Sequence, residues 1–322
     1  MTRFHIALTV AGAISAASPA SANLMITPTF GSSIVSDTNA AAIESTINSA
    51  ILTYGNLFSN PINVPILFQE GSGLGSSSFI LSDISYGTFS TALSNNAQTT
   101  MNTNQLAAVA ANPISALNPV TGTNDILMKC ANIDALFGAG QSGCASDGTI
   151  SLNTGLTTPG SPGSTSQYSL LTVTEHEINE ILGLGSTLGL AFGSYTCSTG
   201  PCTNVPSPED LFRYTSTGAR SFTTATANTY FSVNGTADLA QFNNTNNGAD
   251  YGDWKSNPLP LGVSPQVQDA YASPGTSPTL GLPEITALNV IGYNLVPAPE
   301  PGTSALLAVG MAGLLGLRRR RA

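Results

Sequence analysis

The sequence has little charge and very few basic residues. Only 8% of its 322 residues are Asp, Glu, Lys or Arg, and nine basic residues face eighteen acidic ones. Five of the basic residues, Arg3 and the block 318–321, lie at the two ends of the chain. Residues 23–299 keep four basic residues against seventeen acidic ones. This balance argues against nucleic acid and against anionic membrane surfaces as partners.

Cysteine is also scarce, and no C-x-x-C spacing occurs among the four cysteines. The missing spacing argues against a cysteine-based zinc site. An even number of cysteines in an exported chain instead predicts two disulfides. Of the three connectivities that four cysteines permit, the simplest pairs Cys130 with Cys144 and Cys197 with Cys202.

The N-terminus has the pattern of a secretory signal peptide. Arg3 supplies positive charge, residues 6–17 are apolar or small, and Ala20-Ser21-Ala22 forms an A-x-A cleavage site before Asn23. A buried N-terminal helix is disfavoured because Ser, Pro and Ala directly follow the short apolar run. We therefore predict that residues 1–22 are a signal peptide removed on export.

The C-terminus consists of three blocks. Pro-Glu-Pro at 299–301 precedes a Gly-rich apolar run at 303–317 and four arginines at 318–321. A run of 15 residues is short for a spanning helix, which needs roughly 20 residues, and the arginines favour the cytoplasmic face. This ending resembles the PEP-CTERM sorting signal of Gram-negative bacteria.

That resemblance implies transient association with the inner membrane and recognition by an exosortase. It also implies cleavage near the Pro-Glu-Pro block, followed by release to the cell surface or an extracellular matrix. The alternative is a plain C-terminal membrane anchor. We accordingly expect one domain over residues 23–296 and a sorting signal over residues 297–322.

Apolar periodicity within residues 23–296 predicts both helices and strands, and one helix carries the most unusual residues. That helix is expected over residues 167–182 and ends at Gly183, which suits a C-cap. Further helices are expected over Ala40–Leu57 and 99–110, strands over 62–68 and 148–153, and a closing helix and strand over 284–293.

The most informative segment of that helix is His176-Glu177-Ile178-Asn179-Glu180, which reads H-E-x-x-E. It differs by one letter from the H-E-x-x-H helix of zinc metalloproteases. On a helix, His176 and Glu180 lie one turn apart on the same face, and zinc accepts both imidazole and carboxylate ligands. Glu177 would then be the general base that takes a proton from the attacking water. A carboxylate in place of the second imidazole weakens zinc as a Lewis acid and favours harder metals.

The same five-residue pattern also arises by chance in acidic surface helices. Two features favour a metal site. The only histidine besides His5 is surrounded by three glutamates in a chain poor in charge, and Gly183 stands where the longer H-E-x-x-H-x-x-G-x-x-H pattern has its turn glycine. The third ligand position of that pattern falls on Ser186, a poor zinc ligand. A third ligand must therefore come from elsewhere.

Residues 176–183, H-E-I-N-E-I-L-G, resemble the H-E-I-S-E-x-x-G signature of a bacterial family of predicted metalloproteases that often carry PEP-CTERM tails. Similar blocks follow in order at residues 207–214, 230–235, 248–254 and 284–293, so the resemblance spans most of residues 168–294. It implies an α+β, zincin or metzincin-like fold with a mixed sheet packed on the motif helix. It also implies a zinc-dependent endopeptidase acting on protein or peptide substrates. The closing block contains no methionine, so a metzincin Met-turn is not supported.

Within this resemblance, Asp210 in the D-L-F-R-Y block is our candidate for the third zinc ligand, and Glu209 is the neighbouring alternative. Equally well, Asp210 caps a short helix that starts at Leu211 and pairs with Arg213.

Two further acids, Asp250 and Asp253, flank a glycine-containing turn. They suit a structural Ca²⁺ site, although a solvated Asx turn is the simpler reading. Trp254 follows directly and is expected to pack in the core.

The sequence thus predicts an exported zinc metallopeptidase with His176, Glu180 and Asp210 as zinc ligands and Glu177 as general base. The alternative from another class is a catalytically inactive protein of the same fold at the surface or in a biofilm matrix. Its Asn- and Thr-rich surface would then bind polysaccharide or other cells. A third hypothesis is a metal site that stabilises the fold without hydrolysis.

Overall fold

The computed structural model describes residues 23–297 except for 161, 163–164, 190, 198–199, 226 and 246. The predicted signal peptide and nearly all of the predicted sorting signal, including its apolar run, lie outside the described residues. Within the described part, no helix is long and apolar enough to cross a bilayer.

A four-stranded mixed sheet supports the fold. Its strand order is β1 (Met25–Phe30), β2 (Asn63–Glu70), β6 (Gly148–Leu152) and β3 (Gly75–Phe79). The first three strands are parallel, and β3 runs antiparallel to β6 at one edge. Alternate residues of β2 are buried, as expected for a strand with one face on the core.

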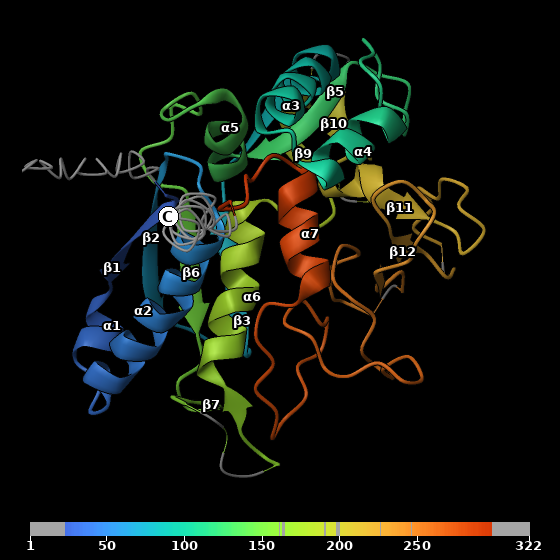
Figure 1. Cartoon of the computed structure of the whole chain (residues 1–322). Helices are drawn as coiled ribbons and strands as arrows, with labels where there is room; N and C mark the ends of the chain where they lie inside the picture. Colours follow the sequence, from blue (N-terminus) through green and yellow to red (C-terminus); the bar gives the residue numbers. More distant parts are fainter. Residues whose placement is uncertain are drawn as a thin grey trace, which may run out of the picture.

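Two helices pack side by side against this sheet (Figure 1). Helix α2 (Ala40–Leu57) contacts β1, and α6 (Leu170–Leu182) contacts β6 and the edge strand β3. The buried residues of α2 recur every three or four positions, at Ile43, Ile47, Ala50 and Tyr54, which is the spacing of one helix face. The short helix α1 (Ser32–Val35) contacts β2.

A second group of elements surrounds the other end of α6. Helix α7 (Leu282–Val290) contacts both α4 (Thr103–Ala111) and α6, and lies beside α6 in Figure 1. Helices α3 (Tyr86–Thr100) and α5 (Cys130–Phe137) pack near the antiparallel pair β4 (Leu81–Ser85) and β5 (Asp125–Lys129). The remaining short elements are β7 (Thr157–Thr158), β8 (Tyr168–Ser169), β9 (Ala191–Cys197), β10 (Gly200–Thr203), the 3-10 helix η1 (Glu209–Phe212), β11 (Arg213–Tyr214), β12 (Tyr230–Phe231) and β13 (Ala240–Gln241).

The structure confirms an α+β architecture with a mixed sheet next to the motif helix. Helix α2 has the predicted bounds, and the strands predicted over 62–68 and 148–153 correspond to β2 and β6. The closing segment forms α7, followed by a single bridge between Leu295 and Phe58 rather than a strand.

The helix predicted over residues 99–110 is wrong as a single element. Met101 adopts a left-handed conformation with φ of 52°, which ends α3, and Asn102 begins α4. The Asn102 side chain accepts hydrogen bonds from the backbone N–H groups of Asn104 and Gln105, so it is an N-cap. The motif helix likewise starts at Leu170 instead of residue 167, because Ser169 caps it through the Thr172 N–H.

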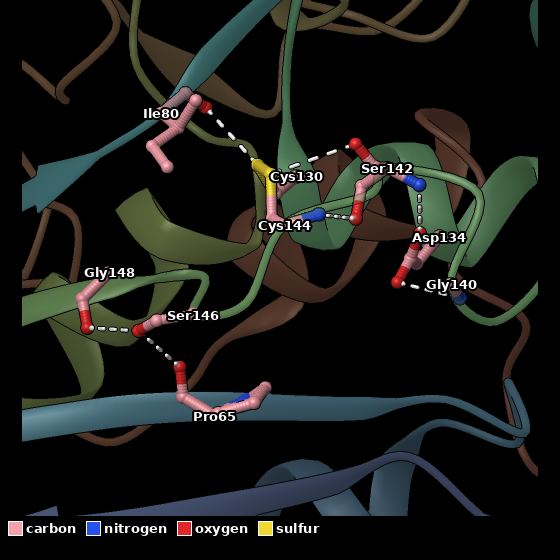
Figure 2. The surroundings of a disulfide bond; sticks show 9 residues. All are labelled: Pro65, Ile80, Cys130, Asp134, Gly140, Ser142, Cys144, Ser146 and Gly148. Atoms are coloured by element: carbon pink, nitrogen blue, oxygen red, sulfur yellow. Dashed lines mark hydrogen bonds between the residues drawn. A yellow bond between two sulfur atoms is a disulfide. The ribbon is translucent and has the colours of Figure 1, made fainter.

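Both predicted disulfides are present, Cys130–Cys144 and Cys197–Cys202. Figure 2 shows the first of them closing the loop between α5 and β6. The carboxylate of Asp134, on α5, accepts hydrogen bonds from the backbone N–H groups of Gly140 and Ser142 in this loop. The loop leading into β6 is thereby fixed on the core.

Candidate metal centre

Helix α6 presents its motif residues in two directions. Ile178, Ile181 and Leu182 have no exposed surface and anchor the helix in the core. His176 and Glu180 lie one turn apart, and each side chain keeps 17% of its surface exposed. The helix ends at Gly183, whose φ of 132° suits glycine, and a Cβ there would lie 2.9 Å from Ile291 Cδ1. The predicted C-cap is therefore confirmed.

A second carboxylate meets this pair from a distant part of the sequence. His176 Nε2 lies 3.5 Å from Glu180 Oε1 and 3.7 Å from Asp253 Oδ1. One ligand atom from each of the three residues falls within 4.8 Å of the others. One imidazole and two carboxylates form a donor set that zinc accepts, with room for a further ligand.

The imidazole is oriented for metal binding. His176 Nδ1 lies 3.0 Å from the carbonyl oxygen of Val267. A carbonyl oxygen only accepts hydrogen bonds, so Nδ1 carries the hydrogen and the neutral ring keeps its lone pair on Nε2. That lone pair faces the two carboxylates. The donor set of these residues thus fits a divalent cation.

Both carboxylates are also held in place. Ser77 on β3 donates its hydroxyl hydrogen to Glu180 Oε2. Gln268 Nε2 donates to Asp253 Oδ1 over 2.9 Å. These contacts leave Glu180 Oε1 directed at His176 and fix the side chain of Asp253 beside it.

A chain of buried side chains connects Asp253 to helix α2. Gln268 Oε1 accepts a hydrogen bond of 3.0 Å from Asn179 Nδ2. Asn179 Oδ1 in turn accepts a hydrogen bond of 2.8 Å from the hydroxyl of Tyr54. Asn179, Gln268 and Tyr54 have no exposed surface, so this relay has little freedom to rearrange.

Glu284 at the start of α7 anchors the segments next to Asp253 and Gln268. Its Oε1 accepts hydrogen bonds from Trp254 Nε1 at 3.0 Å and from the backbone N–H of Gln268 at 3.2 Å. Trp254 is 1% exposed and packs against Phe231 and Phe242, as its predicted core position requires. The segments on either side of the site are thus tied to one buried carboxylate.

The electrostatics of the cluster favour a bound cation. Burial raises the pKa of Asp253 to about 8, although the His176 imidazole opposes this rise. Burial would also raise the pKa of Glu180, but its hydrogen bond to His176, with Lys129 and Ser77, lowers this pKa to about 2. Burial disfavours a charged His176, yet the surrounding carboxylates, Asp253 foremost, raise its pKa well above the ordinary value. Buried carboxylates that lie this close together repel one another, so they need either bound protons or a cation between them.

Glu177 lies between α6 and the edge strand β3. It is 5% exposed, and its Oε2 has no hydrogen-bond partner among the described residues. A Cβ added at Gly75 would overlap Glu177 Oε1, so the glycine allows this close approach. Burial, followed by the charge of Glu180, raises the pKa of Glu177 to about 8.

A cavity of about 120 Å³ opens beside His176 and Glu177. Its other lining residues come from the start of β3, the first turns of α6 and the segment after Val267: Leu74, Gly75, Thr172, Val173, Val267, Asp269, Ala270 and Ala272. The cavity is thus mostly apolar and reaches the motif residues.

Asp210, the third ligand predicted from the sequence, does not join this cluster. Its carboxylate accepts hydrogen bonds from Ser186 Oγ at 2.6 Å, Thr187 N at 3.1 Å, and Ser207 N and Oγ at 2.9 Å. Arg213 Nη1 lies 3.9 Å from Asp210 Oδ1, as the alternative ion-pair interpretation predicts, but the short helix η1 begins at Glu209, so Asp210 does not cap it. The ligand atoms that lie within 4.8 Å of one another belong to His176, Glu180 and Asp253, and we therefore replace Asp210 by Asp253 as the third ligand candidate.

The neighbouring acids also have structural partners. Glu209 Oε2 accepts the backbone N–H of Gly185 over 2.5 Å. Asp250 Oδ1 accepts the N–H groups of Gly252 at 2.6 Å and Ser186 at 2.8 Å, which is an Asx turn. Asp250 and Asp253 therefore face different partners, and no cation-binding group within the described residues contains both.

Comparison with known proteins adds information on the end of the chain. A model of the PEP-CTERM protein-sorting motif family matches residues 297–321. The chain ends in a PEP-CTERM sorting motif. This motif supports export, processing by an exosortase-type system and sorting to the surface in bacteria. No curated protein and no solved structure matches the chain.

Proposed function

We propose that this surface-sorted protein is a zinc-dependent metallopeptidase. In this proposal His176, Glu180 and Asp253 hold the zinc, and Glu177 is the general base. One observation carries it: Asp253 reaches the H-E-x-x-E pair at the side where His176 Nε2 keeps its lone pair.

The position of the helix next to an antiparallel edge strand supports a zincin-like arrangement. Strand β3 supplies Ser77 to Glu180 and leaves room at Gly75 for Glu177. Its outer edge has no strand partner among the described residues. An extended peptide can add to such an edge through main-chain hydrogen bonds, which would place its amide groups beside α6.

The chain's own residues account for the proton transfers of a peptide hydrolysis. Zinc held at such a site supplies Lewis-acid chemistry, which acidifies water and polarises a carbonyl group. Glu177 has an oxygen without a partner next to the cluster and is suited to take a proton from water and pass it to the leaving amine. The pKa of this carboxyl is raised by burial, which makes its ionised form a stronger base.

Two substitutions separate metal binding from hydrolysis. Zinc analysis of the purified exported protein should give about one zinc per chain, and His176→Ala should remove it. Glu177→Gln should keep the zinc and abolish casein or peptide hydrolysis. If His176→Ala leaves the zinc content unchanged, the metal proposal fails. If Glu177→Gln leaves hydrolysis unchanged, the general-base role fails. Zinc binding without hydrolysis in the unmodified protein would favour the stabilising metal site.

A further inference from the structure

The cavity beside His176 contains a carboxyl group that the proposed hydrolysis does not use. Asp269 lines this cavity and is 4% exposed. The walls around it are formed mainly by small or aliphatic side chains, among them Val173, Val267 and Ala272. Mostly apolar walls with a few buried polar groups are the usual composition of a ligand site, and Asp269 is the acid in this lining that lies outside the H-E-x-x-E motif.

One of the two oxygens of the Asp269 carboxyl group lacks a hydrogen-bond partner among the described residues. Asp269 Oδ2 accepts the backbone N–H of Gln266 over 2.9 Å. Its Oδ1 is buried and has no hydrogen-bond partner among the described residues. Leaving such an oxygen unpaired destabilises the folded protein, and more so when the group is ionised. The cost is recovered when a ligand brings a donor.

The backbone around Asp269 is fixed, so the side chain cannot easily turn toward water. The backbone of Asp269 forms an isolated parallel β-bridge with that of Trp254, and the N–H of Ala270 donates a hydrogen bond to the Trp254 carbonyl over 2.9 Å. Trp254 is itself anchored to Glu284. The position of the carboxyl group is therefore part of the same rigid region that orients the metal cluster.

No lysine or arginine of the described part of the chain lines this cavity. Lys129 donates to the Leu184 carbonyl, Arg213 to Tyr251 and Asn244, and Arg220 to Leu211. Lys255 lines a different cavity. His176 lines the same cavity, and it opposes the burial that raises the pKa of Asp269 to about 7. It makes no hydrogen bond to Asp269 Oδ1, which has no donor among the described residues, so a ligand is left to supply that donor.

We infer that this cavity binds a protonated amino group of the peptide substrate, with Asp269 as the recognising residue. The inference rests on the proposed function. An ammonium group on a methylene stem fits apolar walls with a carboxylate among them, and it would supply the donor that Oδ1 lacks. The ammonium comes either from a lysine side chain or from the free N-terminus of the peptide.

Binding measured apart from hydrolysis tests this inference. Three alanine-rich peptides are titrated against the full exported protein by calorimetry. The first is N-acetylated with one central lysine, the second is N-acetylated with norleucine in its place, and the third has norleucine and a free N-terminus. We expect at least one charged peptide to bind about tenfold or more tightly than the neutral one, as a charged hydrogen bond predicts. Which of the two binds more tightly identifies the source of the amino group.

Asp269→Asn should remove this preference while leaving the binding of the neutral peptide unchanged, because asparagine retains an acceptor for the Gln266 N–H. The unchanged neutral peptide shows that the variant is folded. Asp238→Asn is the matched control, because Asp238 is exposed and lines another cavity. Equal binding of all three peptides, or a preference that survives in Asp269→Asn, overturns the inference. Loss of hydrolysis in Glu177→Gln is a separate result, so the two proposals fail independently.

Discussion

Asp253 Oδ1 lies 3.7 Å from His176 Nε2, while the other ring nitrogen of His176 faces the Val267 carbonyl at 3.0 Å. The two contacts assign opposite roles to the two nitrogens: one is a hydrogen-bond donor and the other is free to bind a cation. This relationship turns an incomplete helical motif into a three-residue cluster.

The identity of the third ligand leads to the first prediction. Asp253→Asn should lower zinc affinity by at least tenfold, because a neutral amide is a poor zinc ligand. Asp210→Asn should leave the zinc stoichiometry unchanged but lower the melting temperature, since it disturbs the hydrogen bonds to Ser186, Thr187 and Ser207. Competition titration with a zinc indicator measures the first effect. A larger loss of zinc in the Asp210 variant would restore that residue as the ligand.

The buried relay behind Asp253 leads to the second prediction. Gln268→Leu removes the donor to Asp253, and zinc affinity should fall about 10–100-fold, as for other residues that orient a ligand. Tyr54→Phe removes only the far end of the relay and should have a smaller effect on zinc affinity. The same indicator titration compares both variants. Unchanged affinity in Gln268→Leu would show that Asp253 does not need this orientation.

Gly75 is predicted to control the general base without touching the metal cluster. Gly75→Ala places a Cβ where Glu177 Oε1 now lies, so the carboxyl group must move. We expect kcat for peptide hydrolysis to fall at least tenfold while bound zinc stays at the level of the unmodified protein. A Ser76→Ala variant on the same strand serves as the control. Full activity in Gly75→Ala would contradict the placement of Glu177.

The stability of the fold should depend on the ionisation of Asp147, near the Cys130–Cys144 loop. Burial, and then the Asp134 carboxylate, raises the pKa of Asp147 from 3.8 to about 7. Between these values the folded state binds more protons at Asp147 than the unfolded state does, so the contribution of this group to stability is fully present below about pH 4 and is lost as the pH rises through about 7. Asp147→Asn should therefore lose less melting temperature than the unmodified protein between about pH 5 and pH 8. Identical pH profiles of the two proteins would contradict this pKa.

Local signals in the sequence account for much of the fold. The apolar period of α2, the glycine after α6 and the cysteine spacing correspond to contacts close in sequence, and the structure confirms each. Strand β3 was not predicted because its sequence, Gly-Ser-Ser-Ser-Phe, has only one large apolar residue. It is a strand because β6 pairs with it. Tertiary pairing here overrides a weak local preference.

The candidate site divides in the same way. The spacing of His176, Glu177 and Glu180 in the sequence predicted that these residues lie together, because their proximity depends only on helix geometry. Asp253 depends on a long-range contact, and its turn was predicted to bind calcium or solvent. The available signal was its place in the block 248–254, one of the blocks that carry the resemblance. Asp210 was preferred because it lies past the Cys197–Cys202 loop, where a chain returning from the motif helix could present a carboxylate, yet its carboxylate accepts hydrogen bonds from Ser186 and Ser207.

Diffraction at the zinc absorption edge, from crystals of the protein grown with zinc, would locate the metal among its proposed ligands. We expect one strong anomalous peak about 2.0–2.2 Å from His176 Nε2 and from a carboxylate oxygen of both Glu180 and Asp253. No peak at His176, or a peak that includes Asp210 and not Asp253, would contradict this ligand assignment.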